Sequence, residues 1–120
     1  MKGYIDSSGD PVIETTIIGS RGQIKVVALI DTGFSGAICI PVKLAIQLGL
    51  ELISEVTVEY ADGTRKDELV FSGKMIWDED TKDIEIYLTR SEDLLIGKEL
   101  FNDGVLEINF IKRAVVFRRQ

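Results

Sequence analysis

The stretch from Ala28 to Pro41 reads A-L-I-D-T-G-F-S-G-A-I-C-I-P. An apolar run, Val26 to Ile30, ends at Asp31-Thr32-Gly33, and apolar residues resume after Ser35-Gly36. This pattern predicts a strand buried on both faces, a tight glycine-containing turn and a second strand. Asp-Thr-Gly alone is a weak signal, because Asp and Gly are ordinary turn residues. A carboxylate at the end of a buried strand is costly unless it is satisfied, so its position favours a functional role over a simple hairpin turn.

This strand–turn–strand arrangement resembles the active-site loop of the aspartic proteases. Pepsin-like enzymes carry two such loops in one long chain, whereas these 120 residues contain one Asp-Thr-Gly. The chain therefore resembles the retropepsin-like branch (clan AA), in which two identical chains share one site. The resemblance implies an all-β acid-protease barrel with one or two short helices. Asp-Thr-Gly followed by Phe34, any residue and Gly36 is similar to a group of small prokaryotic homologues.

The expected chemistry explains why one copy of the loop is not enough. Two carboxylates about 3 Å apart cannot both ionise, so they hold one proton between them. One acts as general base on a water, while the protonated one polarises the scissile carbonyl. Asp31 alone supplies half of this pair, and a two-fold homodimer would supply the other half. The chain has no histidine, so Cys39 lacks the usual base of a cysteine nucleophile.

Later segments follow the retropepsin order over roughly residues 12 to 118. Residues 41–48 are predicted to form a short helix, with Pro41 at its first position and Gly49 at its end. Two strand-like arms, Val56–Tyr60 and the segment around Leu69–Phe71, then flank a turn with a strong Asp-Gly hairpin signal. In the family, a hairpin in this place is the flap that closes over the substrate. The residues assigned to it are Ala61, Asp62, Gly63 and Thr64.

The remaining site residues are also assigned from the resemblance. Thr32 would bond the partner loop across the two-fold axis, and Gly33 would let backbone approach the carboxylates. Phe34 stands where most active members have Ala or Ser, so it either lines a substrate pocket or crowds it. The element that braces the active-site loop would be Leu94-Leu95-Ile96-Gly97, and the short helix Lys98–Phe101 would follow it.

Alternation and turn residues predict the other strands. Residues 19–22 read as a hairpin loop; the alternative, a Gly-x-x-Gly nucleic-acid clamp, would need a basic patch. Residues 78–83 read as a solvated turn rather than a calcium loop, because the central glycine is missing. Arg118-Arg119 is expected to be a frayed tail. The predicted strands are Lys2–Asp6 (peripheral), Val12–Ile18, Gln23–Ile30, Ile84–Leu88, Val105–Phe110 and Ala114–Phe117.

Composition bounds the partners. With 45% apolar residues, residues 1–120 can form a single domain with one core. A net charge of −6 and a pI of about 4.6 argue against nucleic-acid binding. No apolar run approaches a membrane span, and no signal peptide is visible, so we expect a cytoplasmic protein. Cys39 cannot form an intrachain disulfide and is expected to be a small buried residue.

Two functions from different classes remain. The first is a homodimeric aspartic endopeptidase that hydrolyses extended peptide or protein substrates, with its own precursor among the candidates. The second is a retropepsin-fold dimer that binds peptides or proteins with little or no hydrolysis. The intact Asp31-Thr32-Gly33 favours the first and Phe34 favours the second. Proteases of this type use no metal or organic cofactor, so the resemblance implies none here.

Overall fold

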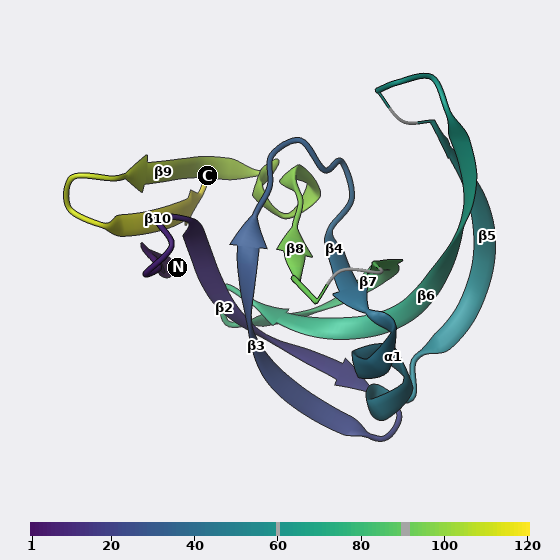
Figure 1. Ribbon diagram of the computed structural model, residues 1–120. Coiled ribbons are helices and arrows are strands. Elements are labelled where there is room, and N and C mark those ends of the chain that lie inside the picture. Colours follow the sequence, from purple (N-terminus) through teal and green to yellow (C-terminus); the bar gives the residue numbers. More distant parts are fainter. Residues whose placement is uncertain (60, 90–91) are drawn as a thin grey trace.

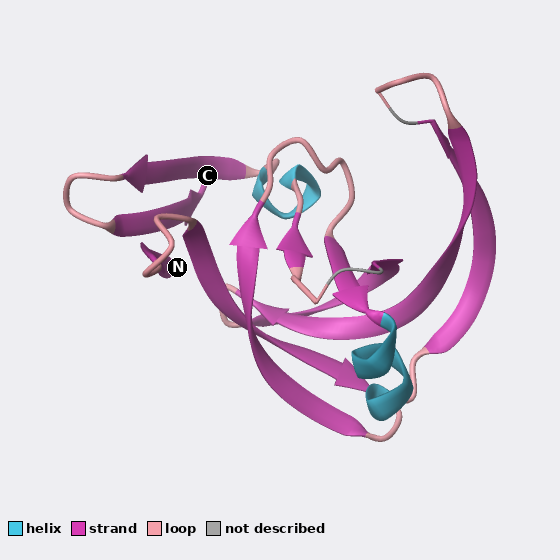
Figure 2. Ribbon diagram, viewed as in Figure 1, coloured by secondary structure: helices cyan, strands magenta, loops and turns pink. Residues whose placement is uncertain are grey.

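The computed structural model describes residues 1–59, 61–89 and 92–120. These residues form mostly strands with two short helices (Figure 2). The elements are β1 Lys2–Ile5, β2 Pro11–Gly19, β3 Gly22–Ile30, β4 Ile38–Pro41, α1 Val42–Leu48, β5 Glu51–Glu59, β6 Arg65–Trp77, β7 Asp80–Thr89, β8 Leu95–Ile96, the 3-10 helix η1 Lys98–Phe101, β9 Gly104–Asn109 and β10 Ala114–Arg119.

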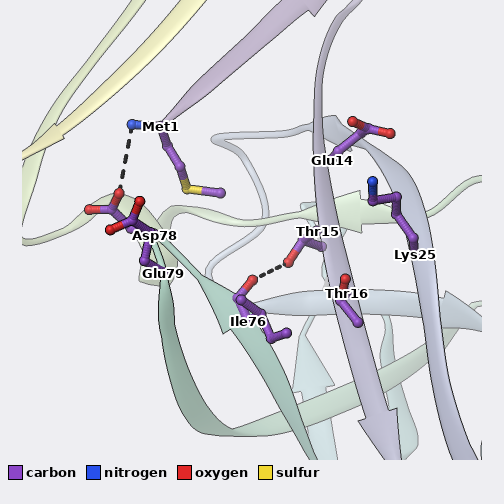
Figure 3. A pocket seen from close by; sticks show the side chains of 8 residues that line it. All are labelled: Met1, Glu14, Thr15, Thr16, Lys25, Ile76, Asp78 and Glu79. Atoms are coloured by element: carbon purple, nitrogen blue, oxygen red, sulfur yellow. Dashed lines mark hydrogen bonds and ion pairs between the residues drawn. The ribbon is translucent and has the colours of Figure 1, made fainter.

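Six of these strands close into a barrel. Their order is β2-β3-β8-β4-β7-β6, and the end of β6 returns to pair with β2. At this seam Thr16 pairs with Ile76, and the buried Thr15 hydroxyl donates a 2.6 Å hydrogen bond to the Ile76 carbonyl (Figure 3). Closure removes the free sheet edges of these strands. The predicted all-β, retropepsin-like barrel with short helices is confirmed.

Four strands extend the sheet beyond the barrel. β5 pairs with the outer half of β6 and forms a long hairpin, while β1, β10 and β9 continue the sheet from β2. The two hairpins, β5–β6 and β9–β10, project from the barrel at opposite sides (Figure 1). The prediction that the first strand is peripheral is wrong, because β1 pairs with β2 on one edge and with β10 on the other.

A cluster of aromatic side chains fills one end of the core. Trp77 packs against Phe101 and Phe117, with ring centroids 5.4 and 5.9 Å away, and Phe101 and Phe117 lie 5.2 Å apart. The buried Trp77 indole N–H donates to the Leu100 carbonyl at 3.1 Å. Buried aromatic rings contribute large apolar areas, and an indole N–H needs a partner when it is buried. The cluster therefore fixes η1 against β6 and β10.

The β2–β3 hairpin docks under α1. Gly19 pairs with Gly22, as the predicted hairpin loop requires. A side chain at Gly19 would overlap the Leu48 carbonyl oxygen, so only glycine permits this approach. Gly49 ends α1 in the left-handed region with φ 66°, and its carbonyl accepts a bond from the Ser20 hydroxyl. The predicted helix and its end at Gly49 are confirmed, but the helix begins at Val42: Pro41 is the last residue of β4 and caps the helix.

Two further expectations are wrong. Val27 is 44% exposed, so β3 alternates between the core and solvent where the sequence predicted burial on both faces. Arg119 is not a frayed tail: it lies in β10 and its guanidinium contacts Asp80 at 2.7 Å and Asp103 at 3.3 Å. Both differences arise because exposure and ion pairing depend on strands that are distant in sequence.

Among the described residues, no helix is long and apolar enough to cross a membrane.

Thr15→Val should lower the free energy of unfolding by about 1–3 kcal/mol, because it leaves the Ile76 carbonyl without its donor. Urea unfolding followed by the fluorescence of Trp77, the single and buried tryptophan, measures the change. The matched control is Thr81→Val at an exposed position of β7, which should stay within about 0.5 kcal/mol of the wild type. Equal effects of the two substitutions would contradict the importance of the seam.

Candidate active site

The short strand β8 lies between β3 and β4, the two strands that the Asp-Thr-Gly loop connects (Figure 1). It runs parallel to β3, with Ile96 beside Ile30, and antiparallel to β4, with Ile96 beside Ile38. A strand paired on both edges has its backbone groups satisfied, as a buried element requires. β8 therefore holds the two ends of the loop at a fixed separation.

Three backbone bonds continue this support into the loop. The Asp31 amide donates to the Ile96 carbonyl, the Gly97 amide donates to Ala37, and the Lys98 amide donates to Phe34, each at 2.9 Å. Gly97 is buried, and a Cβ there would overlap the Gly36 carbonyl oxygen and come within 2.5 Å of the Phe34 carbonyl oxygen. Only a residue without a side chain permits this contact.

Asp31 follows the last residue of β3 and is half-buried. Its carboxylate oxygen Oδ1 accepts a 2.9 Å hydrogen bond from the Gly33 amide. Thr32 and Gly33 are exposed on the surface of the single chain. The loop thus presents one oriented carboxylate, with exposed neighbours that a second chain can reach.

A cavity of about 610 Å³ opens beside Asp31. The loop contributes Asp31, Gly33, Phe34, Ser35 and Gly36 to its wall. Strands of the barrel contribute Cys39, Tyr87, Leu88, Thr89 and Leu95. The β5–β6 hairpin contributes Val58, Glu59, Ala61, Lys66, Asp67 and Glu68. The Asp-Thr-Gly loop and the hairpin therefore line one cavity. The loop between β3 and β4 lies at the end of the barrel away from α1 (Figure 1).

The turn at the hairpin tip is built around Asp62. Its carboxylate accepts bonds from the Thr64 hydroxyl and amide, at 2.7 and 3.0 Å, and these bonds lower the pKa of Asp62. Gly63 has φ 85°, which suits glycine in a turn. Of the four residues assigned to the flap, Ala61 lines the cavity, whereas Asp62, Gly63 and Thr64 do not line it. Tyr60, the last residue of one predicted arm, lies outside the described residues.

Sequence reasoning did not assign a site role to several cavity residues. Glu68 was not considered, although it stands two positions from the buried Val70 and so shares its face of β6. Tyr87 pairs with both Val70 and Cys39, which places all three on the cavity side of the sheet. Alternation along β7 was a signal for Tyr87, but it did not indicate which face of the strand meets the loop.

Cys39 is half-buried in the cavity wall, not fully buried as the sequence predicted. Burial raises the pKa of its thiol to about 11, and the nearby Glu68 carboxylate adds to the increase. Because the thiolate is the reactive form of cysteine, this environment keeps Cys39 unreactive near neutral pH.

A second cavity, of about 300 Å³, lies at the β2–β6 seam (Figure 3). There the Met1 amino group lies 3.7 Å from an Asp78 carboxylate oxygen. Asp78 and Glu79 form the turn between β6 and β7, and both have positive φ, as a type I′ hairpin turn requires. None of the residues assigned to the active site lines this cavity.

The barrel and its inserted loop define a retropepsin-like, aspartic protease-type fold. A retropepsin-like aspartic protease from Rickettsia conorii superposes with a TM-score of 0.71 and 19% identity, over 98% of this chain and 88% of that one. The protease of simian foamy virus (mac) superposes with a TM-score of 0.54 and 17% identity, over 76% of this chain and 91% of that one. A scan against protein-family models and a search of curated proteins both find no match. At these identities the likeness concerns the fold.

Gly97→Ala should destabilise the protein by about 3 kcal/mol or more, because the new methyl group meets backbone oxygens that cannot move independently. Gly9→Ala is the matched control: Gly9 has φ 85° and nothing within 4 Å of the added Cβ, so strain alone should cost about 1–2 kcal/mol. Urea unfolding compares the two. A smaller effect at Gly97 than at Gly9 would show that the loop tolerates displacement.

Alkylation of Cys39 by iodoacetamide at pH 8 should be roughly a hundredfold or more slower in the folded protein than in urea, because the raised pKa leaves little thiolate. The rate should rise about tenfold per pH unit up to pH 10, where the thiol approaches its pKa. Mass spectrometry of timed samples measures the rate. Rapid labelling of folded protein at pH 8 would mean that the thiol is not held in its neutral form.

Proposed function

We propose that the protein is a homodimeric aspartic endopeptidase. The observation that carries the proposal is the cavity that Asp31 shares with the β5–β6 hairpin. A peptidase of this kind needs a carboxylate at the base of a cleft and an element that covers the cleft, and this cavity has candidates for both. The fold that the chain shares with two proteases supports the same conclusion.

In the proposed reaction, Asp31 of each chain lies beside the two-fold axis and the pair holds one proton. The ionised carboxylate takes a proton from a water, whose oxygen attacks the carbonyl carbon of the peptide bond. The protonated carboxylic acid donates to the carbonyl oxygen and stabilises the tetrahedral intermediate. When the C–N bond breaks, a proton from the pair passes to the leaving nitrogen. The proposed reaction requires no metal or organic cofactor.

Each supporting residue has a proposed task. Thr32, exposed in the single chain, bonds the partner's loop across the axis, and Gly33 orients the carboxylate through its amide bond to Oδ1. Ala61, Asp62, Gly63 and Thr64 form the flap, in which backbone amides pair with an extended substrate. Leu95, Ile96 and Gly97 brace the loop from below.

A peptide-binding dimer without hydrolysis is the second candidate, and Phe34 in the cavity wall favours it. Cleavage of a peptide library between pH 3 and pH 8 separates the two functions. The endopeptidase should cleave library members with a maximum on the acid side of neutrality, where the pair carries one proton. Binding of library members without cleavage at any pH would favour the second candidate.

Asp31→Asn should abolish cleavage, because an amide cannot take a proton from water, while the dimer is retained or strengthened as repulsion across the axis is relieved. Library cleavage and sedimentation at tens of micromolar measure the two effects. The control is Asp83→Asn, whose carboxylate is 84% exposed on β7 and should leave cleavage unchanged. A monomeric wild type, or cleavage that survives Asp31→Asn, would overturn the proposal.

A further inference from the structure

The ring of Phe34 packs in a defined position in the wall of the cavity. It meets the ring of Tyr87 edge to face, with centroids 5.9 Å apart and planes at 89°. The two rings come from different parts of the fold, because Phe34 lies in the active-site loop and Tyr87 in β7. Edge-to-face contact is a favourable geometry for aromatic pairs, so Tyr87 helps to hold the Phe34 ring in place.

Two glycines provide the space that the ring occupies. A Cβ at Gly36 would lie 2.7 Å from Cζ of Phe34 and 3.1 Å from Cε2 of Tyr87. A Cβ at Gly97 would lie 2.7 Å from Cδ2 of Phe34. All three distances are shorter than an ordinary carbon–carbon contact. The ring therefore packs directly on the backbone of both glycines.

The backbone of Phe34 is fixed as well. Its amide donates to the Asp31 carbonyl at 3.1 Å, and its carbonyl accepts from the Lys98 amide at 2.9 Å. With the backbone held at both ends and the ring seated on two glycines, Phe34 has little freedom to retreat when a substrate enters. Because the Phe34 ring is closely packed, it limits the size of a substrate side chain that can fit beside it.

We propose that Phe34 is the wall that limits the size of the substrate side chain bound next to Asp31. The inference rests on the proposed peptidase function and adds its substrate class: peptides with an aliphatic side chain, and not a large aromatic one, beside the cleaved bond. Cys39 pairs with both Tyr87 and Leu95, so these three uncharged residues lie together in the cavity wall, whereas the charged residues of the wall come from the Asp-Thr-Gly loop and the β5–β6 hairpin. Hydrophobic pockets discriminate by about 10- to 200-fold per methylene, so a ring-sized change is measurable.

The first test varies the wall. A peptide cleaved in the library is resynthesised with Ala, Val, Leu, Phe or Trp on either side of the cut bond, and kcat/KM is measured for each. The wild type should prefer Leu over Trp. Phe34→Ala should shift the Trp-to-Leu ratio of kcat/KM toward Trp by about tenfold or more. The matched control is Phe110→Ala in the exposed β9–β10 turn, 60% exposed, which should leave the ratio unchanged.

The second test keeps Phe34 and adds a methyl group at Gly36, on whose backbone the ring packs. Gly36→Ala should push the Phe34 ring into the cavity. The kcat/KM for Leu peptides should then fall toward the value for Trp peptides, and the kcat/KM for Ala peptides should change least. Adding Phe34→Ala to Gly36→Ala should restore cleavage of peptides with the larger side chains, because the methyl group then no longer displaces the Phe34 ring. If the effects of Gly36→Ala and Phe34→Ala on kcat/KM were independent, they would add in the double variant and cleavage would not be restored.

The outcomes separate this inference from the proposed function. The inference is wrong if the wild type cleaves but Phe34→Ala keeps the same preference among side chains. It is also wrong if Phe34→Ala lowers kcat/KM equally for all peptides and lowers the melting temperature, because the ring then only supports the loop. If Phe34→Ala does not fold, Phe34→Leu and Gly36→Ala still test the preference. If the wild type cleaves no library member at any pH, the proposed function fails, and the inference that rests on it fails with it.

Discussion

The backbone pairing of β8 with β3 and β4 is the constraint on which the candidate site depends. Two residues, Leu95 and Ile96, are paired on both edges, and the following amides of Gly97 and Lys98 bond the loop itself. Ile96 and Gly97 are buried, so breaking their bonds would leave unsatisfied backbone groups. The loop that carries Asp31 therefore has one low-energy position, set by a segment more than sixty residues away in the sequence.

The core holds this brace from behind. η1 follows Gly97 directly, and its Leu100 carbonyl accepts the indole N–H of Trp77. Phe101 packs into the same aromatic cluster. Orientation of a carboxylate is thus supported by a buried hydrogen bond and by ring packing at the end of β6. Packing and hydrogen bonds around a functional side chain can hold it in one orientation even when the side chain itself is flexible.

Phe34 shows how a large side chain next to Asp31 can be accommodated. From the sequence alone it is a bulky residue that directly follows the Asp-Thr-Gly turn. In the folded protein Gly36 and Gly97 provide the space for its ring, and Tyr87 contacts it edge to face. The spacing Phe-x-Gly is visible in the sequence, but its reason is not, because Gly97 and Tyr87 come from distant segments.

The sequence by itself determined the order of strands, helix and hairpins and the position of Asp31 at a strand end, and its resemblance to the aspartic proteases implied the barrel class. Local alternation and turn residues encode the positions of the strands, helix and hairpins over a few residues. Only the tertiary structure decided that β1 lies inside the sheet, that Arg119 is paired, that Val27 is exposed and that Tyr87 and Glu68 face the cavity. Local patterns indicate that a strand has two faces. Which neighbours cover each face is determined by pairing between residues far apart in the chain.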